Sequence, residues 1–73
     1  MSDKKKVAIL ERRLRRLRGY FPELRDVALL ALAREFANLP QIAAADDDDL
    51  RGLPGVGEAM VKYVRKVIRE QGL

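Results

Sequence analysis

The segment Leu-Pro-Gly-Val-Gly at residues 53–57 places two glycines directly before a stretch with helical apolar spacing. The start of a helix leaves backbone N–H groups unpaired and carries a partial positive charge, which favours anions. Because glycine has no Cβ and tolerates positive φ, a phosphate can approach such a turn closely. We predict that the N–H groups of Gly55, Gly57 and Ala59 donate to a phosphate. Val56 belongs to the same contact segment, with its side chain turned inward.

Basic residues stand on both sides of this segment. Arg51 precedes it, while Lys62 and Lys66 follow it, four residues apart along the expected helix. Their charge would support the same phosphate or its neighbour. Contacts to phosphate hold a protein on DNA without reading the base sequence. A plain turn between two helices is the alternative interpretation of residues 53–57.

The distribution of charge also favours nucleic acid as a partner. The 73-residue chain has a formal net charge of +4, but residues 1–18 hold eight Lys and Arg against Asp3 and Glu11, a net charge of +6. The remaining residues sum to −2. Such a basic segment attracts DNA or forms a solvated surface, and composition leaves both interpretations open. Arg16 and Arg18 are the candidate DNA contacts within it.

Apolar residues recur at helical spacing through most of the chain, and no stretch alternates in the manner of a strand. We therefore expect one small all-α domain with five helices. The expected helices span residues 4–17, 22–36, 40–44, 46–53 and 58–71. Gly19 is expected to end the first helix, and Pro22 suits the first turn of the second. Asp46 or Asp47 would cap the fourth.

The two halves of the chain repeat each other at a separation of 36 residues, which places Gly19 on Gly55. The other aligned pairs are Leu14 with Leu50, Leu17 with Leu53, Tyr20 with Val56, Leu24 with Met60, Ala28 with Val64, Ala31 with Val67 and Leu32 with Ile68. One position breaks the symmetry, because Phe21 stands where the second half has Gly57. Either Phe21 is turned into the core, or the first turn has become structural and leaves binding to the arginines around it.

Leu53-Pro-Gly-Val-Gly followed by a helix resembles the helix-hairpin-helix motif, whose pattern is apolar, any residue, Gly, apolar, Gly. The run from Phe36 to Glu58 resembles the linker and second hairpin of tandem helix-hairpin-helix, or (HhH)2, domains. Such domains occur in DNA repair nucleases, in RadC-like proteins and at the C-terminus of the DNA-integrity scanning diadenylate cyclase. The resemblance covers roughly residues 14–72. It implies a compact five-helix fold with a pseudo-two-fold internal repeat.

The resemblance implies binding of the duplex DNA backbone on the minor-groove side, with little regard to sequence. Gly19 would be the matching contact in the first hairpin, since Arg18-Gly19-Tyr20 is similar to a hairpin of the cyclase. Glu58 departs from the many members that carry a lysine soon after the second glycine, and its charge competes with a phosphate for the field of the helix. A larger repair or scanning assembly is the implied setting.

The expected organisation follows from the repeat and the resemblance. A basic disordered tail at residues 1–6 precedes a single domain at 7–73, with a first hairpin at about 7–36, a connector at 37–45 and a second hairpin at 46–71. The alternative function is a protein-interaction or dimerisation module of the same type. An exposed apolar patch around Met60 and Tyr63 on the last helix would favour that alternative.

Chemistry other than binding is not expected. Without Cys or His, the chain has no thiolate, disulfide or usual zinc ligand set. The four aspartates at residues 46–49 lack the spacing of a calcium loop, so we expect helix capping and neither metal nor cofactor. The lyase domain of the family X DNA polymerases is also similar, but Tyr63 stands where its Schiff-base lysine would be. We expect no enzymatic activity, no membrane contact and a cytoplasmic, nucleoid-associated protein.

Overall fold

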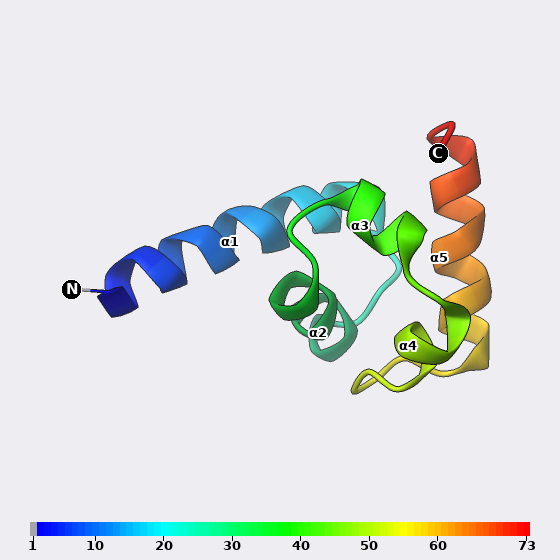
Figure 1. Ribbon diagram of the computed structural model, residues 1–73, viewed down its shortest axis with the longest axis horizontal. Helices are drawn as coiled ribbons and strands as arrows, with labels where there is room; N and C mark the ends of the chain where they lie inside the picture. The colour runs from blue at the N-terminus through cyan, green and yellow to red at the C-terminus, as the bar shows by residue number, and fades with distance from the viewer. Residues whose placement is uncertain (1) are drawn as a thin grey trace.

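A computed structural model of the chain describes residues 2–73, with side chains from residue 5 onward, as helices joined by short turns (Figure 1). The helices are α1 (Ser2–Tyr20), α2 (Asp26–Glu35), α3 (Leu39–Ala44), α4 (Asp47–Arg51) and α5 (Glu58–Glu70). Residues 2–73 contain no strand, which confirms the expected all-α class with five helices. None of these helices is long and apolar enough to cross a lipid bilayer.

One hydrophobic cluster joins side chains from all five helices. Its most enclosed large side chains are Phe21, Leu29, Leu32, Ile42, Leu50 and Val64. In a chain this short, every helix must contribute its apolar face to a single core, because burial of apolar area is the main stabilising term. The positions predicted for the buried stripe of the second helix are confirmed, since Leu24, Ala28, Ala31 and Leu32 are buried.

The first helix does not end at Gly19, in contrast to the expectation from the sequence. α1 continues to Tyr20, and the N–H of Phe21 still donates to the carbonyl of Leu17 at 2.7 Å. The backbone of Gly19 is helical, so this glycine does not provide the left-handed turn that usually ends a helix at such a residue.

The second helix begins one turn later than expected. Pro22 lies in the connecting turn, and α2 starts at Asp26. The ring of Phe21 accounts for this delay: it is fully buried and meets the ring of Tyr63 edge-on, with the ring centroids 6.1 Å apart. The chain carries this ring inward before the next helix begins, so Phe21 is a core residue.

Polar side chains fix the start of α3. The Oδ1 atom of Asn38 accepts a hydrogen bond from the N–H of Gln41 at 3.0 Å, and Oε1 of Gln41 accepts one from the N–H of Ala37 at 2.8 Å. This reciprocal arrangement satisfies amides that the helix leaves unpaired. Asp46 occupies the N-cap position of α4 as expected, but its side chain makes no capping hydrogen bond.

The first half of α1 extends beyond the rest of the molecule (Figure 1). α2, seen nearly end-on in Figure 1, crosses α1 at its second half, so within residues 2–73 the first half has no helix beside it. Residues 2–6 belong to α1 instead of the expected disordered tail, while Met1 lies outside the described residues. Val7, which continues the apolar spacing of Leu10, Leu14 and Leu17, is 53% exposed, because no other helix reaches it.

Candidate nucleic-acid interface

The conformation and packing of the second turn require glycine at position 55. Gly55 has a φ of +77°, a region that costs L-residues with a Cβ about 1–2 kcal/mol. A Cβ at this position would lie 3.1 Å from Cγ1 of Val27 and 3.2 Å from the backbone nitrogen of Ala28. The turn therefore rests on the start of α2, and this contact explains Gly55 without any ligand.

Gly57 differs from Gly55 in both its backbone conformation and its packing. Its φ of −103° and ψ of −172° are extended, and no atom beyond its two chain neighbours lies within 4 Å of the place where its Cβ would be. Gly57 is the N-cap residue of α5, and no side chain caps this helix. Within residues 2–73, the N–H groups of Gly57, Glu58, Ala59 and Met60 donate to no protein acceptor. The start of α5 is therefore an open helix end with its donors directed at solvent.

Val56 cannot serve as a donor in this turn. Its N–H donates to the carbonyl of Leu53 at 3.1 Å, which closes the turn. Its side chain is buried, in agreement with the predicted inward direction. Of the predicted backbone contacts, Gly57 and Ala59 lie at the open end of α5, whereas Val56 stabilises the turn from inside.

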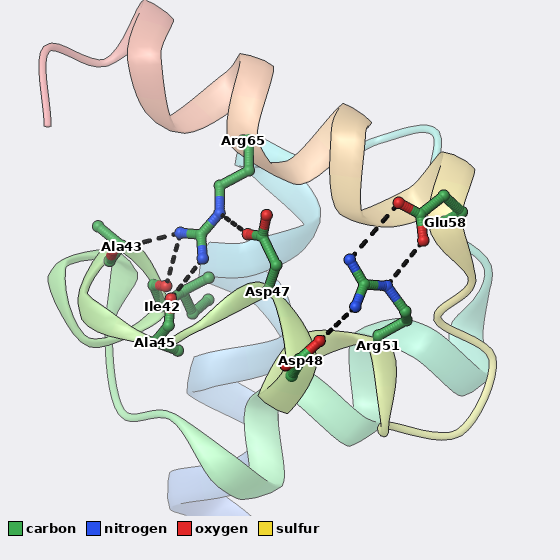
Figure 2. A network of polar contacts seen from close by, with 8 residues as sticks. All are labelled: Ile42, Ala43, Ala45, Asp47, Asp48, Arg51, Glu58 and Arg65. Atoms are coloured by element: carbon green, nitrogen blue, oxygen red, sulfur yellow. Dashed lines mark hydrogen bonds and ion pairs between the residues drawn. The ribbon is translucent and has the colours of Figure 1, made fainter.

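The guanidinium of Arg51 forms ion pairs with acidic neighbours and is not free to bind a phosphate. Its Nε donates to Oε2 of Glu58 at 2.7 Å, and its Nη1 donates to Asp48 (Figure 2). The hydrogen bond to Glu58 and the charge of that carboxylate raise the pKa of Arg51 above its ordinary value, with Asp48 adding to the effect. The same pair directs the carboxylate of Glu58 toward α4. The charge of Glu58, expected to oppose a phosphate, is thus balanced by a guanidinium in contact with it.

Arg65 forms a second network that the sequence interpretation missed. Its Nε donates to Oδ1 of Asp47 at 2.7 Å, and its Nη1 donates to the carbonyls of Ala43 at 3.2 Å and Ile42 at 3.4 Å (Figure 2). Its Nη2 donates to the carbonyl of Ala45. α3 has no basic residue in its last turn, so its terminal carbonyls need a donor from elsewhere. That missing donor is the signal in the sequence that could have identified Arg65 as structural.

Three cations follow the open end of α5. Lys62, Lys66 and Arg69 are exposed and separated by four and three residues, so they share one face of the helix. None of them forms an ion pair within the part of the chain that the structure describes. Lys62 and Lys66 therefore lie as predicted, on the same helix as the free N–H groups.

The start of α2, after the first turn, also has no side-chain cap, but it is less accessible than the start of α5. Gly19 lies within α1, where its N–H is part of the helical ladder. The start of α2 carries Asp26, whose carboxylate accepts from Arg18 at 3.1 Å, and the backbone of Ala28 packs against the second turn. Of the residues predicted here, Arg16 is exposed on α1 and forms no ion pair among residues 5–73.

The last helix does not present the apolar patch that an interaction module of this type would use. Met60 and Tyr63 are partly buried and pack against the hydrophobic core. The hydroxyl of Tyr63 also accepts a hydrogen bond from the N–H of Glu23 at 3.3 Å, which holds this ring against the first turn.

Comparisons with known proteins give no relative from which to transfer a role: the chain matches no protein-family model, no curated protein and no solved structure.

Proposed function

We propose that this chain binds the phosphate backbone of duplex DNA, without sequence preference, at the start of α5. The observation that supports this most directly is the uncapped end at Gly57, followed by Lys62, Lys66 and Arg69 on one helix face. A helix N-terminus attracts a phosphate through its free N–H groups and its dipole, and adjacent cations add to that attraction. One phosphate would accept from Gly57 and Ala59, and the lysines would contact its neighbours.

The resemblance to tandem helix-hairpin-helix domains supports the same proposal. In such a domain both hairpins would contact DNA, on the minor-groove side. Here the first hairpin would contribute only side chains, chiefly Arg16 with its exposed neighbours Arg12 and Arg15 on α1. We infer that the two hairpins bind DNA differently, the second through backbone donors and the first through guanidinium groups. Such a protein would be associated with the nucleoid, within a repair or scanning assembly.

The test is the salt dependence of binding to a fluorescently labelled duplex, followed by anisotropy. Each neutralised phosphate contributes about −0.9 to the slope of log K against log salt, so three to five contacts predict a slope of about −3 to −5. Single-stranded and junction DNA of the same length, measured in parallel, show which form is preferred. Binding that is insensitive to salt would contradict the proposal.

A pair of matched variants separates a defined site from general attraction to a basic chain. Lys62→Ala/Lys66→Ala removes two contacts beside the open end of α5. The slope of log K against log salt should become less negative by about 2. Lys5→Ala/Lys6→Ala removes the same charge at the far end of α1 and should change affinity by less than about threefold. Equal losses from the two variants would mean that charge alone, without a site, accounts for binding.

A further inference from the structure

The N-terminal half of α1 carries exposed apolar side chains that no other helix within residues 2–73 covers. Val7 is 53% exposed and Ile9 is 48% exposed, on either side of the half-buried Leu10. A groove of about 360 Å³ opens there between α1 and the end of α2. Its lining consists of Lys6, Ile9, Leu10, Arg13, Ala33 and Arg34, and we call this surface the α1 groove. Val7 lies outside this lining and borders it on the far side of Leu10.

The charge around the α1 groove is of one sign. Lys6, Arg13 and Arg34 line it, and no acidic side chain among residues 5–73 does. Arg13 is held in place, since its Nη1 donates to the carbonyl of Ala33 at 3.2 Å. The surface therefore combines an apolar centre with a cationic rim in which Arg13 is fixed. Contacts to phosphate come from charged and polar groups, so they would leave the apolar centre unused.

We propose that the α1 groove docks an acidic amphipathic helix of a partner protein. Such a helix would place apolar side chains, spaced three and four residues apart, on Ile9, Leu10 and Val7. Its glutamates and aspartates would face the cationic rim. The complementary charge selects this partner, and it also speeds the encounter.

The size and charge of the surface argue against a second copy of this chain. The exposed apolar surface comprises Val7, Ile9 and the half-buried Leu10, which span four residues or about 6 Å of helix. A symmetric contact over this length would fall below the roughly 1,000 Å² that a stable interface needs, and it would bring like charges together. A membrane is also disfavoured, because Leu14 and Leu17, which would extend the apolar face, pack against the core instead.

The probe is a labelled helical peptide of about 16 residues, with leucines at helical spacing and otherwise glutamate and alanine. Val7→Ser/Ile9→Ser, at two exposed positions, should weaken its binding at least about tenfold. Ala8→Ser, on the opposite side of the same turn, should leave binding unchanged. Amide chemical shifts on the full chain should change around residues 6–13 and 33–34 when the peptide is added.

Several outcomes would overturn the proposal. A scrambled peptide of the same composition that binds equally well would show attraction by charge alone. Self-association or binding to anionic vesicles that disappears in Val7→Ser/Ile9→Ser would assign the face to a second copy or a membrane. The test is independent of the DNA site, because the same double variant should keep DNA affinity within about twofold. A tenfold loss of DNA affinity would make the groove part of the DNA interface instead.

Discussion

Phe21 fills, in the turn after α1, the position that Gly57 holds in the turn before α5. The ring of Phe21 is fully buried, and the chain around it serves the core. Gly57 faces open space, and the helix that follows it has free N–H groups in its first turn. The two turns come from similar sequences, but one closes the hydrophobic core and the other exposes a helix end.

The difference shows what decides the role of such a turn. A large apolar side chain just past the glycine draws the backbone inward, and the following helix starts late, at Asp26. A glycine at the same place imposes no such demand, so α5 starts at once and its donors stay accessible. The second turn also packs on the start of α2 through Gly55, so the uncapped start of α2 is partly covered while that of α5 is open.

The largest expected effect is on stability, at the residue that distinguishes the first turn. Phe21→Ala should lower the free energy of unfolding by about 3–5 kcal/mol, because it removes a fully buried ring from the core. Urea unfolding followed by circular dichroism measures this loss. Since a small domain tolerates little destabilisation, Phe21→Leu, with an expected loss of about 1–2 kcal/mol, serves as the milder variant. A loss below 1 kcal/mol for Phe21→Ala would contradict the structural role.

Replacing glycine should destabilise the protein in the second turn but not in the first. Gly55→Ala should cost about 2–3 kcal/mol, because it adds a Cβ at positive φ within 3.1 Å of Val27. Gly19→Ala should stabilise the protein by about 0.5–1 kcal/mol, since Gly19 is helical and open to solvent. Thermal unfolding of both variants gives the comparison. Effects of the same sign would show that the turns are built alike.

In each half of the chain an arginine donates hydrogen bonds to carbonyls at the end of a helix. The two arginines should contribute differently to the free energy of unfolding. Arg65→Ala should lower the free energy of unfolding by about 2 kcal/mol, because several carbonyls at the end of α3 lose their donor. Arg13→Ala removes a single donor to Ala33 and should cost about 1 kcal/mol or less. Chemical denaturation of both variants tests the order, and a larger loss for Arg13→Ala would reverse it.

The smallest expected effect concerns the ion pair beside the open end of α5. Glu58→Gln should raise DNA affinity about two- to threefold, because it removes a negative charge and releases Arg51 toward the phosphate. Arg51→Ala should lower affinity, since it leaves Glu58 unbalanced. Glu35→Gln, an exposed position on α2, makes the same charge change and is the control. If it raises affinity as much as Glu58→Gln, the ion pair has no local role.

Periodicity predicted the helices well, because the spacing of apolar residues records which face must be buried. The last helix was expected at residues 58–71 and is observed at Glu58–Glu70. The first turn was not predicted correctly, since the depth to which Phe21 penetrates depends on Tyr63, far away in sequence. Local pattern also does not show that Arg51 and Arg65 have acidic or carbonyl partners within reach. Those contacts depend on how α3, α4 and α5 meet.

The most direct test of this account adds the same side chain to both turns. A Cβ added at Gly57 or at Gly19 would lie more than 4 Å from every atom outside the adjacent backbone, so both valine variants should stay folded. Gly57→Val would crowd the free N–H groups of α5 and should weaken duplex binding about tenfold, or about 1.4 kcal/mol, at low salt. Gly19→Val should leave affinity within about twofold. Unchanged affinity in Gly57→Val, or equal losses in both, would contradict the claim that the start of α5 holds the phosphate.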